Sequence, residues 1–284
     1  MNWFKTMILM SLLTAFMVAI GYYIGGSTFA YVMLVFSFGI NLLSYWYSDK
    51  IVLATSNAKQ VDADSEPQLV SIVSKLAKAA ELPMPRVYII NDDAPNAFAT
   101  GRDPQHAAVA VTTGLMDALD TDEISGVLGH ELAHVKHRDI LIGTIAAMMA
   151  GVISTLANFV FWSSSDDEEG GGNFIGNILI MFLAPVAASL IQLAISRSRE
   201  FDADKTGGEI CGNPLYLASA LKKIEEYAQS QMPLQAATTS TAHMYIINPL
   251  ANSKQKLKNL FSTHPLTEER IARLREQAGL VPSR

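Results

Sequence analysis

The residues best suited to chemistry are His130, Glu131 and His134, which form the pattern H-E-x-x-H. The segment 121–129 before them contains no proline and favours a helix, on which residues four apart share one face. Both imidazoles should therefore reach one metal ion, with Glu131 about 100° around the helix. Catalytic zinc takes three protein ligands and a water, from which a glutamate removes a proton. Because this short pattern also arises by chance, its meaning depends on a third ligand.

Four hydrophobic segments set the topology that supplies this ligand. Each is uncharged and long enough for a bilayer, which takes about 20 residues; they are 6–26, 28–47, 140–162 and 174–196. The third begins just after the histidines, and a short acidic turn at 163–173 leads into the fourth. The chain is therefore expected to cross the membrane, turn and return at Arg197 on the side from which it left.

The returning segment 196–204 reads S-R-S-R-E-F-D-A-D and brings new carboxylates to the side of the histidines. Glu200 is the expected third ligand. Asp204 lies four residues further on the same helical face and is expected to accept a hydrogen bond from a ligand imidazole, whereas Asp202 points away. The plain alternative is an interfacial charge cluster, but the H-E-x-x-H pattern and the returning hairpin favour the ligand.

These motifs resemble a known family. H-E-L-A-H, a hydrophobic hairpin and S-R-S-R-E-F-D-A-D are together similar to the HtpX family of bacterial membrane zinc metalloproteases, gluzincins related to the CAAX prenyl proteases. The segments N-A-F-A-T-G at 96–101 and S-T-H-P-L-T-E-E-R-I at 262–271 resemble two further family segments. Leu266 stands where many relatives have a second proline, with no expected functional consequence. The resemblance covers almost the whole chain.

The hydrophobic pattern and the resemblance predict a mainly α membrane protein with four transmembrane helices and a cytoplasmic α+β zincin-like protease domain containing a small sheet. Residues 1–48 would form two transmembrane helices and 140–196 a transmembrane hairpin. Residues 49–139, with the H-E-x-x-H helix, and 197–284, with the third ligand, would form the protease domain. The resemblance implies one zinc ion per chain and an endopeptidase that cleaves misfolded or damaged membrane proteins.

Loop charge predicts the orientation. The turns at 21–27 and 163–173 contain no lysine or arginine, whereas the opposite side carries Lys5, Lys50, Lys59, Lys136, Arg138, Arg197 and Arg199. The positive-inside rule places the site at the cytoplasmic face of a bacterial inner membrane. The first segment is longer than a usual signal-peptide core and is expected to stay as an anchor.

Composition agrees with a membrane-bound enzyme. Half of the residues are hydrophobic, 17% are charged, and the mean hydropathy is +0.22. The net charge of −6 argues against nucleic acid as a partner. The hydrophobic segments imply contact with the lipid bilayer, and the resemblance implies membrane-protein substrates. The single cysteine, Cys211, excludes an intrachain disulfide. The oligomeric state is not predicted.

The water-facing part between the second and third spans is expected to contain a small α/β unit, with a helix at 66–82 and strands at 86–91 and 107–112. Residues between these strands are expected to form an exposed edge that pairs with the substrate backbone, namely Asn96, Ala97, Phe98 and Ala99. A plain turn is the alternative. Further helices are expected at 214–231 and 267–277, with a mobile loop or disordered linker at 231–250.

Two further histidines leave alternatives open. His264, in the family-like segment, is expected either to donate to the oxyanion of the tetrahedral intermediate or to hold the Thr-His-Pro turn before the last helix. His137 shares the helical face of His134 and offers a rival pair, but that pair places Glu131 badly.

Two other functions are alternatives to a membrane endopeptidase. A membrane scaffold with a structural zinc site would not need a base such as Glu131. A prenyl-peptide protease is the rival within enzymes, but relatives with that activity have more spans than the four found in this chain.

Overall fold

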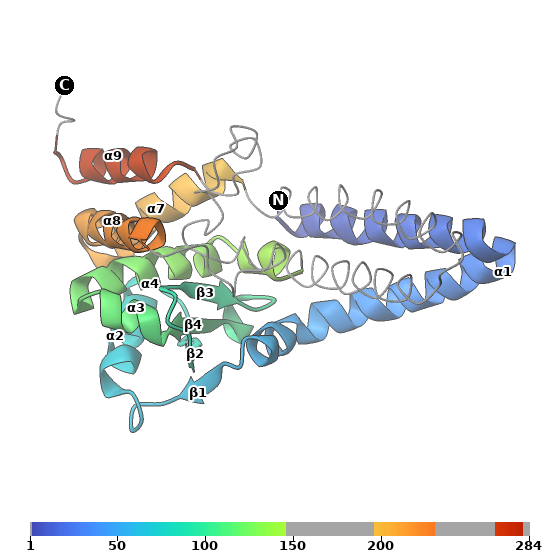
Figure 1. Cartoon of the computed structure of the whole chain (residues 1–284), viewed down its shortest axis with the longest axis horizontal. Coiled ribbons are helices and arrows are strands. Elements are labelled where there is room, and N and C mark those ends of the chain that lie inside the picture. The colour runs from blue at the N-terminus through green and yellow to red at the C-terminus, as the bar shows by residue number, and fades with distance from the viewer. Residues whose placement is uncertain (1, 146–195, 231–264, 281–284) are drawn as a thin grey trace.

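The computed structural model describes residues 2–145, 196–230 and 265–280 (Figure 1). Most of the third predicted span and all but Ser196 of the fourth lie outside this part, as do the turn at 163–173, the segment 231–250 and His264.

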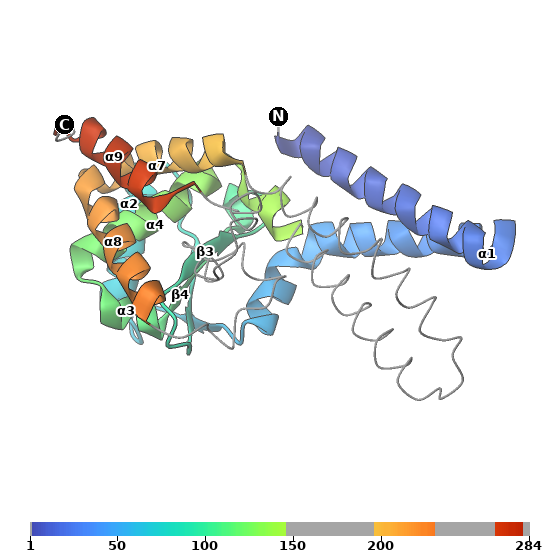
Figure 2. The same ribbon diagram turned by 45° about the horizontal axis from the view of Figure 1, so that its top comes forward.

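A long helical hairpin projects from the domain (Figures 1 and 2). It is the single element α1, Asn2–Thr55, which kinks at Gly25 and Gly26. Gly26 has φ +67°, a conformation that residues with a side chain rarely adopt. The two arms, Thr6–Tyr23 and Gly25–Tyr47, are long and apolar enough to cross a membrane, which agrees with the first two predicted spans.

Many large apolar side chains of this hairpin are exposed. Leu12 is 57% exposed and Phe38 is 69% exposed, so the hairpin is not the core of a soluble domain. Where the arms meet, the Asn41 amide donates to the hydroxyl of Thr14 at 2.9 Å. Such a polar pair holds apolar helices together where hydrophobic burial gives no preference.

A four-stranded mixed sheet lies at the base of the hairpin. Its order is β1 (Lys59–Val61), β2 (Arg86–Ile90), β4 (Ala108–Thr112) and β3 (Ala97–Thr100). The pair β2 and β4 is parallel and the other two pairs are antiparallel. Thus β3 is an edge strand of the described sheet.

Alternate strand residues bury the two faces of the sheet in different cores. Val87, Val109 and Val111 pack in the main core against the helices. On the opposite face, Tyr88, Ile90, Phe98, Ala108 and Ala110 form a smaller cluster with Val52 and Leu53, near the end of α1. The helical hairpin α1 is therefore joined to the domain through the sheet, on which the end of α1 packs.

Helices cover the main-core face. They are α2 (Pro67–Ala79), the short α3 (Thr113–Ala118), α4 (Thr121–Lys136), α7 (Arg197–Cys211), α8 (Pro214–Ser230) and α9 (Thr267–Gln277). A single-turn 3₁₀ helix, Pro104–His106, joins β3 to β4. Helix α4 packs against α7, α8, α2 and β3, and thus lies at the centre of the domain.

The start of α4 is fixed from two directions. Asp120 and Glu123 form a reciprocal capping box, in which each side chain accepts a backbone N–H of the other's residue. From α8, Ser219 donates to Glu123 at 2.7 Å and Lys223 at 2.6 Å. The helix that carries H-E-x-x-H is therefore anchored at its N-terminal end.

Most predictions for the described elements are confirmed. The helix expected at 66–82 is α2, and the last helix has the predicted bounds. The sequence analysis missed β1 and α3 because both are short.

Candidate metal centre

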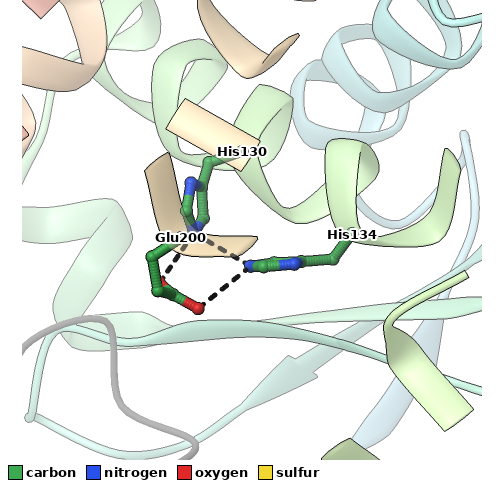
Figure 3. A group of neighbouring side chains, drawn as sticks. All are labelled: His130, His134 and Glu200. Carbon is green, nitrogen blue, oxygen red and sulfur yellow. Dashed lines mark hydrogen bonds and ion pairs between the residues drawn. The ribbon is translucent and has the colours of Figure 1, made fainter. Parts of the chain in front are cut away.

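His130, His134 and Glu200 converge on one point (Figure 3). The two Nε2 atoms of the histidines, both on α4, are 3.2 Å apart. Oxygens of Glu200, on α7, lie 3.6 Å from each of these nitrogens. His130 and Glu200 are buried, and His134 is partly buried. Each imidazole faces a different oxygen of Glu200, and the three side chains together form a donor triangle inside the domain whose ligand atoms all lie within 4.8 Å of one another.

This triangle has the size that a tetrahedral zinc ion requires. Zinc binds imidazole nitrogen and carboxylate oxygen at about 2.0–2.2 Å. In a tetrahedron the distance between ligand atoms is about 1.6 times the bond length, or roughly 3.3 Å with these bonds. The separations of 3.2–3.6 Å are close to that edge, so the residues fit a metal ion held by three ligands from the described part of the chain.

Two glycines let α7 approach α4 closely enough to form the triangle. A Cβ on Gly129 would lie 2.8 Å from the carbonyl oxygen of Gly207. A Cβ on Gly207 would lie 2.7 Å from the backbone nitrogen of His130. Since the obstacles are backbone atoms, only glycine at both positions allows this helix contact.

The close contact predicts the effect of Gly207→Ala. The added methyl group should force the helices apart and lower the free energy of unfolding by about 1–3 kcal/mol, with a loss of metal affinity. Thermal denaturation and metal titration would measure both effects. Gly212→Asn is the matched control, because Gly212 ends the same helix in open space and asparagine tolerates its φ of +80°. Equal effects of the two substitutions would contradict the steric explanation.

Two carboxylates orient the imidazoles. Nδ1 of His130 lies 2.9 Å from Asp204, and Nδ1 of His134 lies 3.3 Å from Asp139. Donation of Nδ1–H to these acceptors leaves the Nε2 lone pairs directed into the triangle. Each ring is therefore held in the tautomer that can bind a metal.

Arginines hold these carboxylates in turn. Arg270 of α9 makes two hydrogen bonds to Asp204, at 2.6 and 2.8 Å, and is 1% exposed. Burial raises the pKa of Asp204, but the Arg270 guanidinium outweighs burial and lowers this pKa to about 2. Arg199 lies 3.7 Å from Asp139. The last helix thus reaches the ligand sphere through a buried ion pair.

The charges around His134 favour a cation. Burial lowers the pKa of this imidazole, but the hydrogen bond to Asp139 and the charges of Glu200 and Glu131 raise it to about 9. The same carboxylates would stabilise a divalent ion. Charge therefore agrees with the donor geometry.

Glu131 lies beside the triangle and contacts the edge strand. Its Oε2 accepts the backbone N–H of Ala99 at 2.9 Å. This N–H therefore points away from β4 and toward α4. The carboxylate is 7% exposed and is positioned between the candidate ligands and β3.

The predicted site residues are only partly brought together. His130, His134, Glu200, Glu131, Asp204 and Ala99 meet at the centre. The side chain of Phe98 packs on the opposite face of the sheet, and the backbone N–H of Asn96 donates to Thr112. Asp202 is exposed, as the helical spacing predicts.

His137 does not join the triangle. It forms the C-cap of α4, and its Nε2 lies 3.2 Å from the Thr206 hydroxyl. Within residues 2–145, 196–230 and 265–280, the metal-binding group formed by three or more such side chains is His130, His134 and Glu200.

Sequence reasoning missed three residues of this network, Asp139, Arg199 and Arg270. In the sequence, Asp139 and Arg199 stand out only as charged residues next to the predicted spans. Arg270 stands in the S-T-H-P-L-T-E-E-R-I segment, where the resemblance was noted but no role was assigned. The sequence feature that could have indicated a role for Arg270 is its position on an otherwise apolar face of the predicted last helix.

Comparison with known proteins identifies the family. The sequence profile of peptidase family M48 matches residues 63–278. A "Protease HtpX homolog" of Methylibium petroleiphilum is 56% identical and aligns over 100% of this chain and 99% of its own. That of Burkholderia cenocepacia is 56% identical over 98% of this chain and 97% of its own.

The fold is similar to that of a solved structure. The crystal structure of S. mikatae Ste24p superimposes with a TM-score of 0.52 at 19% identity, covering 96% of this chain and 66% of that chain. At this identity the likeness concerns the fold alone. The sequence matches, with the two apolar N-terminal helices, show that the chain belongs to peptidase family M48, as a membrane-associated metalloprotease of the HtpX type.

Proposed function

We propose that the chain is a multi-pass zinc endopeptidase of a bacterial inner membrane, and that it cuts misfolded or damaged membrane proteins from the cytoplasmic side. The observation that carries the proposal is the donor triangle beside a buried glutamate on the same helix. Two imidazoles and one carboxylate with an open fourth position are a donor set of catalytic zinc. A structural site would have four protein ligands and would have no use for Glu131.

In this mechanism Glu131 is the general base. It removes a proton from the attacking water and later passes that proton to the leaving amine. When bound, zinc would polarise the scissile carbonyl and lower the pKa of the water. Asp204 and Asp139 keep both imidazoles in the metal-binding tautomer throughout.

The edge strand β3 suits an extended substrate. The N–H and C=O of one strand residue point to the same side, so the backbone groups of Ala97 face away from β4, on the side where Glu131 accepts the Ala99 N–H. A substrate added as a further strand would lie beside Glu131. Backbone pairing makes few demands on sequence, which suits an enzyme that acts on damaged proteins.

The proposed membrane substrates agree with the position of the domain. Val52 and Leu53 pack beneath the sheet only a few residues after the second span ends at Tyr47. The centre is therefore tethered close to the membrane surface, where segments of membrane proteins emerge.

Purification in detergent with a chelator, followed by addition of zinc, tests the activity. We expect no cleavage of casein without metal and cleavage after zinc is restored. A prenylated peptide offered in parallel should be cut no faster than its unprenylated form. Absence of zinc-dependent casein cleavage would contradict the proposal, and a strong preference for the prenylated peptide would favour the rival enzyme class.

Asp139→Asn should lower zinc affinity about 10–100-fold, because the uncharged side chain orients His134 less firmly. A competition titration against a chromogenic chelator measures this change. Asp202→Asn is the control, because it removes the same charge from the exposed face of α7. Unchanged affinity in the Asp139 variant would show that its hydrogen bond does not hold the ligand.

The orientation can be tested by thiol labelling. A cysteine at Ser164, between the third and fourth predicted spans, should react with an impermeant reagent added outside the inner membrane. A cysteine at Ser253 should react only after lysis, because the lysines and arginines hold that side in the cytoplasm. Cys211 is replaced by serine in both variants. The reverse labelling pattern would place the centre outside the cytoplasm.

A further inference from the structure

A pocket separate from the candidate metal centre lies between the end of the second span and the domain. It has a volume of about 530 Å³, and its lining includes Trp46, Tyr47, Lys50, Met84, Arg86 and Arg102. None of its lining residues belongs to the candidate metal centre. The pocket is therefore separate from the groups that are proposed to hydrolyse peptides.

The walls carry an excess of positive charge. Lys50, Arg86 and Arg102 face a single acidic lining residue, Asp49. Arg86 is paired with that carboxylate at 2.6 Å. Arg102 lies 3.6 Å from Asp103, so the three cations are set against two carboxylates and one positive charge remains.

Aromatic rings hold two of these cations in place. The Arg102 guanidinium lies 4.7 Å from the ring centre of Trp46, and the Lys50 ammonium lies 5.3 Å from that of Tyr47. A cation over an aromatic face is attracted by the ring and is held at that position. The pocket thus presents oriented donors to an anion.

The pocket lies at the level where lipid headgroups are expected. The apolar arm ends at Tyr47, and both Trp46 and Tyr47 are about half exposed, as is typical of aromatic residues at a membrane interface. Met84 is apolar and 48% exposed at the same pocket. An occupant should therefore have an anionic group beside an apolar portion.

We propose that this pocket binds the phosphate headgroup of an anionic phospholipid. Lys50 and Arg102 would contact the phosphate oxygens, and Met84 with the rings would contact the start of the acyl chains. The bound lipid would hold the loop between β3 and β4, and with it the edge strand, against the membrane surface. A free phosphate ion offers the same oxygens but cannot use the apolar surface.

Lipid retention by the full-length protein tests the site. The purified protein in mixed micelles containing equal amounts of phosphatidylglycerol and phosphatidylcholine is analysed by native mass spectrometry. Each basic residue near a membrane surface changes anionic-lipid binding by about fivefold. We expect Lys50→Gln with Arg102→Gln to lower the preference for phosphatidylglycerol about 5- to 25-fold. This pair leaves the Arg86–Asp49 ion pair intact.

Matched variants separate the site from net charge and from folding. Lys75→Gln with Lys78→Gln removes two charges from the exposed face of α2 and should leave the preference unchanged. Arg102→Lys should keep most of it. Millimolar inorganic phosphate should not displace the lipid. An unchanged preference in the first double variant, an equal loss in the α2 variant, or displacement by phosphate would overturn the proposal, whatever the outcome for proteolysis.

Discussion

Glu131→Gln should abolish proteolysis while the metal stays bound. The amide has the same shape and can still accept the Ala99 N–H, so the fold and the ligands are preserved. It cannot take a proton from water, and we expect kcat to fall about 10²–10⁴-fold or more. Casein cleavage and metal content would be measured on the same preparation.

Glu209→Gln is the matched control for this loss. Glu209 is exposed on α7 and lies outside the donor triangle, so this variant should retain full activity. Near-normal proteolysis by the Glu131 variant would remove this residue from the mechanism. Loss of metal together with activity would show instead that Glu131 acts mainly in binding the ion.

Glu200→Ala should release the metal. An apparent binding free energy of roughly 10–16 kcal/mol over four ligands suggests about 3 kcal/mol per ligand, or on the order of 10²-fold in affinity. Zinc content after dialysis should fall as it does in His134→Ala. Asp202→Ala, two residues away on the exposed face of the same helix, should keep its zinc. The opposite result would mean that the register of α7 is wrong.

The neighbouring Asp204 requires a gentler substitution. Its removal would take the carboxylate partner from the Arg270 guanidinium, which is 1% exposed, and breaking a buried ion pair in this way typically costs about 3–5 kcal/mol. Loss of metal in Asp204→Ala would therefore mix unfolding with ligand misorientation. Asp204→Asn retains one hydrogen-bond acceptor and separates the two effects.

The local elements of this protein were readable from its sequence. The period of apolar residues predicted α2 and α9, and short β-branched runs predicted β2 and β4. These predictions succeeded because helix and strand periods depend on residues close together in the chain. The parallel pairing of β2 with β4 was not predicted, since strand order depends on contacts between distant residues.

For the candidate centre, too, the sequence predicted which residues lie together on one helix. Helical spacing alone groups His130 with His134, and it separates Glu200 and Asp204 from Asp202. That the two helices meet followed only from the assumed return of the membrane hairpin. Their meeting requires Gly129 and Gly207 at the crossing, because any larger residue would strike backbone atoms.

The sequence by itself therefore determined which side chains have the chemistry of a metalloprotease and which of them share a helix face. Only the tertiary structure decided which groups control them. Arg270 approaches His130 by packing, and Ala99 meets Glu131 because β3 lies against α4. Such contacts join residues 140 and 32 positions apart, and they depend on the packed core rather than on local propensity.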